Sequence, residues 1–279
     1  MDKAQHKTFL ITGVSSGLGK AFAGAALAAG HTVIGTVRQA DAAAAFQAMS
    51  DQAHPLVLDV TDFDAIPAEI ARAEREIGPI DVLVNNAGYG HEGILEESSL
   101  DELRQQFDTN VFGAVAMIKA VLPGMRQRRA GRIINVTSMG GFITMPGIAY
   151  YCGSKFALEG ISEALSKEVR HLGIYVTALA PGQFRTDWAG RSMQRSPRRI
   201  SDYDEVMDPI RATRQAKSGK QPGSPAKAAQ AVLELVASAE PPTRLFLGED
   251  ALHLVADKMK SMQSEMAAWE DVSRSTNFD

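Results

Sequence analysis

A glycine-rich turn between an apolar run and an alanine-rich helix, at residues 8–29, constrains the fold of this chain more than any other stretch. Residues 8–12 form a short apolar run, which is typical of a strand buried on both faces. The turn has the pattern Thr-Gly-x-x-x-Gly-x-Gly. Its glycines let the backbone approach a phosphate, and the next helix N-terminus supplies free N–H groups. A tight turn between packed elements is the alternative, but the strand–turn–helix context favours a nucleotide site. The expected contacts are Gly13, Ser15, Ser16, Gly17, Leu18 and Gly19.

Further strands are expected along the chain, each separated from the next by a helical stretch. Their positions are 32–38, 55–60, 81–85, 131–138, 174–180 and 244–248. Alternating strands and helices are typical of a parallel sheet covered by helices on both faces. The sequence therefore predicts an α/β fold with a Rossmann-type, doubly wound parallel sheet of about seven strands. No shift in composition marks a boundary, so residues 1–279 are expected to form a single domain.

Composition narrows the function classes. The chain has 279 residues and a formal net charge of -4, which gives no sign of a nucleic-acid surface. No apolar run approaches the roughly 18 residues that a membrane span needs, and the N-terminus lacks the apolar region of a signal peptide. Cys152 is the only cysteine, so an internal disulfide is impossible and a reducing compartment is expected. These features predict a soluble cytoplasmic protein.

The end of the second strand bears on the choice of dinucleotide. In such sites an acidic residue takes the ribose 2′-hydroxyl, whereas an arginine accommodates a 2′-phosphate. Here Val37 holds the terminal position and Arg38 follows it, which favours NADP(H) over NAD(H). Arg38 could instead be a solvated surface charge, or stack on adenine without selecting for the phosphate. Asp59, at the end of the third strand, is either a ligand contact or a turn or N-cap residue.

Tyr151 and Lys155 form the candidate catalytic pair. They stand four residues apart in a stretch with helical spacing, so both side chains share one face of the helix. A free phenol has a pKa of about 10, and a neighbouring ammonium favours the phenolate. Tyr151 could then act as the general acid for a carbonyl or the general base for an alcohol. Such a pair also arises by chance, so the assignment depends on the other segments.

Three further segments carry polar candidates. Residues 85–88, Asn-Asn-Ala-Gly, end the fourth strand and leave room for a flat ligand. Asn110 lies in a helical region predicted over residues 100–128, where asparagine is unfavourable, so a kink or a polar ligand is expected there. Ser138 ends the fifth strand, where a hydroxyl serves either catalysis or a nearby backbone group.

Two later regions have distinct patterns. Residues 183–225 are the least regular part of the chain, and a long segment of this kind is either a functional lid or disordered. Its place after the sixth strand favours a substrate lid. Its arginines would attract an anionic substrate or, as the simpler interpretation, form a solvated surface. Residues 250–272 carry apolar residues at spacings of three and four, which predicts an amphipathic helix that packs on its own domain or on a neighbouring subunit.

Taken together, these segments resemble the short-chain dehydrogenase/reductase family over roughly residues 7–250, with the motifs in the family's order. Residues 12–19 are similar to the family's cofactor loop, and residues 85–88 to its strand-four motif. Tyr151 and Lys155 are similar to its active-site pair. Its nicotinamide-side loop is matched by Pro181, Gly182 and Thr186. Four motifs in register are far more specific than any one of them.

The resemblance implies a catalytic tetrad of Asn110, Ser138, Tyr151 and Lys155. Tyr151 would donate the proton to a carbonyl oxygen as a nicotinamide delivers hydride to carbon, and Ser138 would hydrogen-bond the same oxygen. Lys155 would lower the pKa of Tyr151 and bind the nicotinamide ribose, while Asn110 would hold a water that connects Lys155 to solvent. No metal is implied. The remaining implied cofactor contacts are Asp59 and Val60 at adenine, Asn86, Ala87 and Gly88 along the cofactor path, and Thr186 at the carboxamide.

Two features set the chain apart from members of this family. Neither Ser15 nor Ser16 is the basic residue that many NADP-preferring members carry in the glycine loop, although Arg38 resembles their second-strand residue. The tail beyond Gly248 is longer than in many tetrameric members. We therefore expect a dimer formed by the long helices around residues 110 and 160, with a tetramer as the alternative.

These observations predict an NADP(H)-dependent carbonyl reductase or alcohol dehydrogenase for a small, lipophilic substrate. The alternatives are an NAD-dependent alcohol dehydrogenase and a catalytically silent NAD(P)-sensing protein of the same fold. A sugar-nucleotide epimerase or dehydratase would need a larger C-terminal domain and a different glycine spacing. The residues beside the motifs are mostly apolar with flexible methionines, which suits a bulky ketone or aldehyde. The expected pocket lining is Tyr89, Met139, Phe142, Met145, Gln183, Phe184, Trp188 and Met193.

Overall fold

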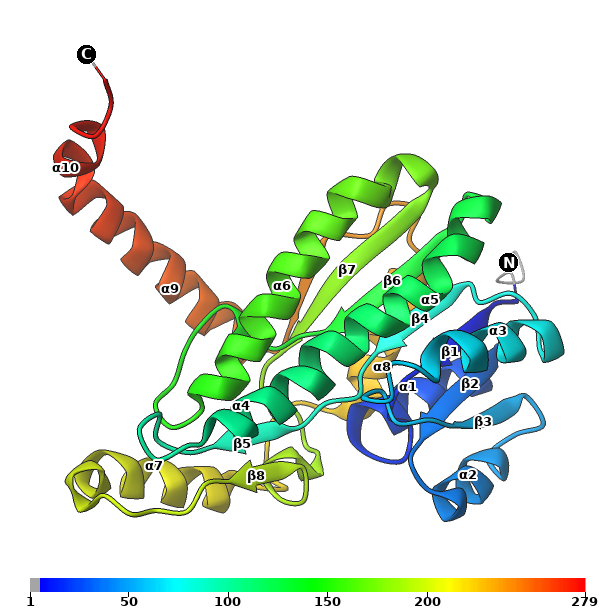
Figure 1. Ribbon diagram of the computed structural model, residues 1–279, viewed down its shortest axis with the longest axis horizontal. Coiled ribbons are helices and arrows are strands. Elements are labelled where there is room, and N and C mark those ends of the chain that lie inside the picture. Colours follow the sequence, from blue (N-terminus) through cyan, green and yellow to red (C-terminus); the bar gives the residue numbers. More distant parts are fainter. Residues whose placement is uncertain (1–5, 279) are drawn as a thin grey trace.

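The computed structural model describes residues 6–278 and contains a large sheet with helices on both faces (Figure 1). Its seven strands are parallel to their neighbours and follow the order β3-β2-β1-β4-β6-β7-β9. This arrangement confirms the predicted Rossmann-type doubly wound sheet. The strand bounds are β1 Thr8–Ile11, β2 Thr32–Val37, β3 Ala53–Val57, β4 Val82–Asn85, β6 Gly131–Val136, β7 Ile174–Pro181 and β9 Arg244–Leu247.

Two apolar clusters, one on each face, hold the helices to the sheet. In β1, Ile11 enters the first cluster and Leu10 the second, and both side chains have no exposed surface. A strand whose alternate side chains enter different cores must be apolar throughout, which explains the continuous runs in the sequence. The first cluster packs α1 Gly17–Ala28, α2 Ala40–Gln47 and α8 Pro225–Ala237, and the second packs α3 Ile66–Glu76, α5 Gly113–Arg128 and α6 Ala149–Val169.

The strand order places a crevice at the centre of the sheet. The chain proceeds from β1 outward through β2 to β3, and then returns to β4 on the other side of β1. In open parallel sheets, ligands bind beyond the carboxyl ends of the strands at such a reversal. The glycine turn follows β1 and residues 86–88 follow β4, so both lie at this crevice. β3 ends at Val57, earlier than the predicted residue 60, which leaves Asp59 and Val60 in the loop beyond the strand.

The long helical region predicted over residues 100–128 is interrupted, as Asn110 led us to expect. α4 (Leu100–Phe107) starts at a capping box in which Ser99 and Glu102 bond each other's backbone N–H groups. A π-helical turn, Asp108–Phe112, then joins α4 to α5. Such turns are found mostly as single insertions in α-helices, often at functional sites. Asn110 is in this turn and is 1% exposed.

Residues 183–225 are more regular than their composition suggested. A 14-residue helix, α7 (Asp204–Lys217), crosses this segment with Pro209 inside it. β8 (Met193–Arg195) pairs with β5 (Gly90–Glu92) in a separate two-stranded parallel sheet. α7 was not predicted because Met207 is its one buried residue, so it lacks the apolar stripe by which an amphipathic helix is identified. Met207 packs against Gly147, in the segment that leads to Tyr151.

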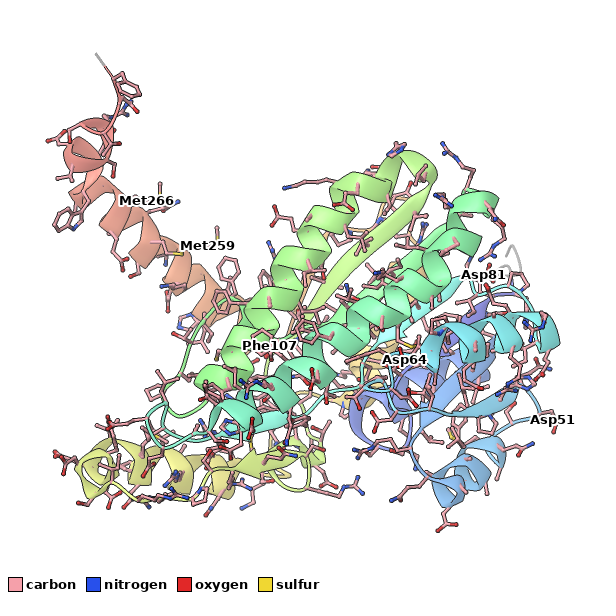
Figure 2. The ribbon with its side chains drawn as sticks, viewed as in Figure 1. Asp51, Asp64, Asp81, Phe107, Met259 and Met266 are labelled. Carbon is pink, nitrogen blue, oxygen red and sulfur yellow. The ribbon has the colours of Figure 1, made fainter. Side chains whose placement is uncertain are left out.

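The C-terminal helix leaves the body of the molecule. α9 (Glu249–Ala268) and the short α10 (Glu270–Arg274) extend outward from the end of β9 (Figure 1), and Met259 and Met266 are seen on the projecting part (Figure 2). Ala251 and Val255 are buried at its base, whereas Met266 is 71% exposed. The expectation that the whole apolar stripe packs on its own domain is therefore wrong beyond this base. The other exposed stripe residues are Leu252, Met259, Met262 and Trp269. Across residues 6–278, we find no helix with the length and apolarity of a membrane span.

Candidate active site

A cavity of about 1320 Å³ occupies the crevice at the carboxyl ends of the central strands. Its walls run from the glycine turn, past the ends of β2, β4 and β6, to α6 and then to α7. Typical small-molecule pockets have volumes of roughly 300–1,000 Å³. This cavity is therefore large enough for a dinucleotide together with a second, smaller molecule.

The glycine turn has the backbone geometry of an anion site. Gly13 (φ 74) and Gly17 (φ 58) adopt left-handed conformations that side chains strain to reach. Ser16 is the N-cap of α1, but its hydroxyl makes no capping hydrogen bond, so it does not occupy the N–H groups at the helix start. Gly19 is buried and does not line the cavity; a side chain there would collide with Asn86 and the Gly13 carbonyl. The turn residues that line the cavity are Gly13, Ser15, Ser16, Gly17 and Leu18.

The segment after β4 is held against this turn by short hydrogen bonds. The Asn86 side-chain amide donates to the Thr12 carbonyl at 2.9 Å and to the Gly13 carbonyl at 3.2 Å. The backbone N–H groups of Asn86 and Ala87 both donate to the Thr12 hydroxyl at 2.9 Å. Gly88 keeps the space beside them open, since a Cβ there would lie 2.9 Å from Asn110 Oδ1. This glycine-lined channel suits the flat rings and diphosphate of a dinucleotide.

Arg38 and Asp59 lie at the far end of the same cavity. Arg38 is exposed and lines it, and among residues 6–278 it has no acidic partner. Asp59 also lines it, but its carboxylate accepts hydrogen bonds from the Thr61 N–H at 2.9 Å and the Thr61 hydroxyl at 2.8 Å. Asp59 therefore makes a turn and faces the cavity at once. It does not cap α3, which starts at Ile66 with Ala65 before it.

Tyr151 is a buried phenol in the middle of the cavity wall. It is 7% exposed, and burial raises its pKa to about 12, while a hydrogen bond with Ser138 acts in the opposite direction. Ser138 is held in place because its hydroxyl accepts a 3.0 Å hydrogen bond from the Gly140 N–H. The Trp188 ring packs against the Tyr151 ring, with 5.0 Å between the two ring centroids. A phenol with this pKa is protonated at neutral pH, which is the form that a general acid requires.

Lys155 lies one helical turn below Tyr151 and is also buried. Its ammonium donates a 2.8 Å hydrogen bond to the Val136 carbonyl and lies 5.9 Å from the centroid of the Tyr151 ring. Burial lowers the pKa of Lys155 to about 8, and the charge of Glu159 opposes that change. Burial has the largest effect on Tyr151, so the pKa of this phenol is raised overall rather than lowered.

Asn110 is fixed by three protein partners. Its amide nitrogen donates to the Tyr89 carbonyl and to the Ser154 hydroxyl, each at 3.1 Å. Its oxygen accepts a 3.1 Å hydrogen bond from the Tyr89 N–H. Both amide hydrogens are thus used within the protein, and a water at this side chain could bond only to the remaining lone pair of the oxygen.

The structure brings together most of the residues expected to contact substrate. Two do not line the cavity. Phe142 packs against Phe246 at 5.8 Å between ring centroids, on the side of the loop that faces α9. Met193 is 6% exposed and packs against Gly90, its partner residue in the two-stranded sheet. Those that do line it are Tyr89, Met139, Met145, Gln183, Phe184 and Trp188, and the loop residues Pro181, Gly182 and Thr186 lie beside them.

Two groups of residues at this cavity were not predicted from the sequence. One face of α7 lines the cavity, at the helical spacing i, i+3, i+4, i+7, with Ile210, Thr213, Arg214 and Lys217. Glu159, 4% exposed, accepts hydrogen bonds from Thr137 at 2.6 Å and Arg244 at 2.7 Å, one turn after Lys155. The only available signal for Glu159 was a carboxylate on the same helical face as the catalytic pair.

Comparisons with known proteins agree with this geometry. The chain matches the family model described as short chain dehydrogenase over residues 7–196. It is 36% identical over 269 residues to Oxidoreductase BOA17 of Botryotinia fuckeliana, covering 96% of this chain and 98% of that protein. It is 38% identical over 246 residues to the 3-ketodihydrosphingosine reductase of Bacteroides thetaiotaomicron, covering 88% of each. A solved short-chain dehydrogenase from Streptomyces avermitilis has a TM-score of 0.91 at 41% identity, covering 98% of this chain and 99% of that one.

The matched stretch contains the glycine turn, the end of β4, Ser138 and the pair Tyr151 and Lys155. The relatives named above are similar over nearly the whole chain, beyond the end of the matched stretch. The same sheet, the same crevice and the same order of motifs therefore lead to one assignment. The chain belongs to the short chain dehydrogenase family and is an NAD(P)-dependent oxidoreductase.

Proposed function

We propose that this oxidoreductase uses NADP(H) and interconverts a lipophilic ketone or aldehyde with its alcohol, with Asn110, Ser138, Tyr151 and Lys155 as the catalytic tetrad. The observation that carries the proposal is the Tyr151 phenol, which is buried in the cavity wall between Ser138 and Lys155. The glycine channel extends from this point toward Arg38. A reacting carbonyl beside Tyr151 would then be in reach of both the phenol and a dinucleotide in the channel.

In this proposal Tyr151 is the general acid in reduction and the general base in oxidation. Its raised pKa keeps the proton on the phenol until a carbonyl oxygen starts to gain negative charge. The Ser138 hydroxyl accepts from Gly140 and hydrogen-bonds Tyr151, and its proton can turn to the same carbonyl oxygen when a substrate is bound. When bound, the nicotinamide supplies or accepts the hydride.

Lys155 and Asn110 act around Tyr151. Lys155 uses one ammonium hydrogen on the Val136 carbonyl, which leaves two for a ribose hydroxyl and for proton return to the phenol. With a pKa of about 8, Lys155 can give up a proton near neutral pH at little cost. Asn110 ties the π-helical turn to Tyr89 and Ser154, and so keeps the floor beneath Lys155 in place.

The preference for NADP(H) is supported by the end of β2. The position at which other dinucleotide sites carry a ribose-binding carboxylate is Val37 in this chain, and its side chain is buried. The exposed guanidinium of Arg38 can form a bidentate pair with a 2′-phosphate. Asp59, the acidic residue at this end, is turned toward Thr61.

Affinities for NADPH and NADH, measured side by side by titration calorimetry, test this preference. The wild type should bind NADPH at least about tenfold more tightly, and Arg38→Ala should remove most of that advantage while leaving NADH affinity within about threefold. Equal affinities in the wild type would overturn the preference and favour an NAD-dependent enzyme. Loss of affinity for both NADPH and NADH in the variant would mean that Arg38 contacts the adenine ring rather than the 2′-phosphate.

A lipophilic substrate is supported by the apolar part of the cavity wall, formed by Met139, Met145, Phe184 and Trp188. Methionines adapt to substrates of differing shape. The 3-ketodihydrosphingosine reductase to which this chain is similar is named for a long-chain ketone, which supports the same class here. NADPH oxidation should therefore be screened first with medium-chain and long-chain ketones.

We also propose a cytoplasmic homodimer. The buried, single cysteine Cys152 supports a reducing compartment. Phe112, 51% exposed, ends the π-helical turn before α5, and Phe156, 42% exposed, is on α6; both belong to the helical regions that we expect to form the interface. Light scattering that gives only the monomer mass at micromolar concentrations would contradict the dimer, and cell fractionation tests the compartment.

A further inference from the structure

Glu92 is a carboxylate buried under α7, and three arginines gather on it. Its side chain is 3% exposed, and it comes from β5. Arg195, on β8, lies 3.4 Å from Glu92, and Arg211, on α7, lies 3.5 Å from it. Arg214, one turn further along α7, donates a hydrogen bond to the same carboxylate. Glu92 therefore contacts both β8 and α7, the strand and the long helix within residues 183–225.

This cluster carries more positive than negative charge. The side chains of Arg211 and Arg214 are each 14% exposed, and both pair with the carboxylate of Glu92. Arg211 Nη1 is buried and has no hydrogen-bond partner within residues 6–278. Buried cations need compensating anions, because water cannot solvate them there.

The neighbouring carboxylates are hydrogen-bonded to other groups, although the charge of Glu97 also acts on Arg211. Glu97 accepts from the N–H groups of Arg199 and Ile200. Glu102 caps α4 through Ser99 and also accepts a hydrogen bond from Ser196. The remaining carboxylates of α7 that pair with a cation, Asp204 and Asp208, both bind Arg198. Within the buried part of the cluster, two guanidinium groups pair with the one carboxylate of Glu92.

Part of this positive charge faces the cavity. Arg214 and Lys217 lie one helical turn apart on the face of α7 that lines it, and Arg191 lines it from the preceding loop. Arg214 is close enough to the catalytic helix that its charge acts to lower the pKa of the Cys152 thiol, the residue after Tyr151, although burial has the larger, opposite effect. The acidic residues that line the cavity, Asp59, Asp108 and Asp187, lie outside α7.

We propose that the α7 wall, formed by Arg214 and Lys217 with Arg191, is a subsite for an anionic group of the substrate, a carboxylate or a phosphate. Glu92 is the positioning residue that holds Arg214 in this wall. The inference rests on the proposed function and adds the substrate class: an amphiphile whose reacting carbonyl lies at Tyr151, whose alkyl part lies along Met139 and Met145, and whose acidic group binds α7.

A binding experiment without turnover tests the subsite separately from the reaction. Octanoate, octyl phosphate and 1-octanol share one alkyl chain and differ in charge, and their affinities for the full chain saturated with NADP⁺ can be compared by calorimetry. Octanoate or octyl phosphate should bind at least about tenfold more tightly than 1-octanol, because a desolvated guanidinium strengthens a charge-assisted hydrogen bond. The tighter of the two anions identifies the acidic group.

Variants on the same segment locate the site. Arg214→Gln should reduce the advantage of the anion over 1-octanol to within about threefold, and Lys217→Gln, at an exposed position, should reduce it in part without the risk of misfolding. Arg199→Gln is the matched control, since it removes an exposed charge that does not line the cavity. The control should keep the full advantage.

Three results would overturn the proposal: equal affinities of the wild type for the anions and 1-octanol, no measurable binding of either anion, or the same loss in Arg199→Gln as in Arg214→Gln. If the cofactor assignment fails, the same titrations in NAD⁺ still give the anion preference. If instead no ketone is reduced but the anions bind as expected, the proposed reaction fails and the subsite remains.

Discussion

The Lys155 ammonium lies 5.9 Å from the centroid of the Tyr151 ring and donates a hydrogen bond to the Val136 carbonyl at 2.8 Å. No carboxylate bonds directly to it among residues 6–278, and Glu159 one turn away bonds Thr137 and Arg244 instead. The buried ammonium is thus held by a neutral carbonyl. Its charge is poorly solvated, and its pKa falls from 10.5 to about 8.

This pKa predicts a pH-dependent stability. Below about pH 8 Lys155 is protonated in the folded and unfolded chains, and the folded state bears the cost of burying the charge. Between about pH 8 and 10.5 the unfolded chain binds more protons than the folded one, so the free energy of unfolding rises with pH. Over the lower part of this window, up to about pH 9.5, the rise should be on the order of 2 kcal/mol.

Urea unfolding of the wild type and Lys155→Met across about pH 8 to 9.5 measures this effect. The variant has a neutral side chain of similar length, so its free energy of unfolding should lack the rise. Tyr151, whose pKa is raised to about 12, contributes in the opposite direction only above about pH 10, outside the window. Parallel curves for the two proteins would show that Lys155 is not a buried cation.

Tyr151→Phe should remove turnover and keep the cofactor site. The change deletes one hydroxyl, and loss of a general acid typically costs 10²–10⁴-fold, so we expect kcat to fall about a thousandfold. NADPH affinity should change by less than about threefold, because the phenyl ring of the variant still fills the place of Tyr151 in the cavity wall. Tyr150→Phe is the matched control: its hydroxyl donates to the Ser98 carbonyl, away from the cavity. Residual turnover of Tyr151→Phe within tenfold of the wild type would exclude the proposed acid.

Sequence patterns predicted the sheet and the glycine turn because their causes are local. Leu10 and Ile11 enter different cores, so β1 must be apolar throughout, and the glycines of the turn meet left-handed backbone angles that few other residues adopt. Asn110 was recognisable because a buried amide is out of place in a regular helix. Each of these signals is contained in a few neighbouring residues.

The wall formed by α7 could not be predicted in the same way. Its cavity face is partly cationic, and it is held by Glu92, which lies 122 residues before Arg214 in the chain. Nothing near either residue in the sequence indicates the other. The arginines of residues 183–225 therefore gave the pattern of a solvated surface, whereas folding places two of them, Arg191 and Arg214, in the cavity wall. For the same reason the position of Phe142 was wrong, since its packing depends on Phe246 from a distant strand.

Glu92→Gln should loosen α7 and lower the stability of the protein. The amide keeps the shape of the side chain but removes the charge that pairs with Arg211 and Arg214, and breaking a buried ion pair costs about 3–5 kcal/mol. We expect a loss of about 3 kcal/mol in urea unfolding, with faster amide hydrogen exchange in α7 than in α5. Glu205→Gln, an exposed position on α7, is the control and should change stability by less than about 0.5 kcal/mol. Unchanged exchange in α7 would mean that Glu92 does not hold this helix.

The base of the C-terminal helix should matter to the active site, and its projecting part should not matter to the folded monomer. Val255 is 4% exposed and packs in one cluster with Met139, which lines the cavity, whereas Met262 is 44% exposed on the projecting part of the same helix. Val255→Asp buries an unpaired carboxylate, so it should cost at least about 2 kcal/mol and raise KM as Met139 shifts. Met262→Asp makes the same charge change in water and should leave the free energy of unfolding and KM unchanged within experimental error.

A large stability loss in Met262→Asp at concentrations where the protein is monomeric would mean that the apolar stripe of α9 does pack on its own chain. If that loss occurs only at concentrations where the protein associates, a second copy covers the stripe.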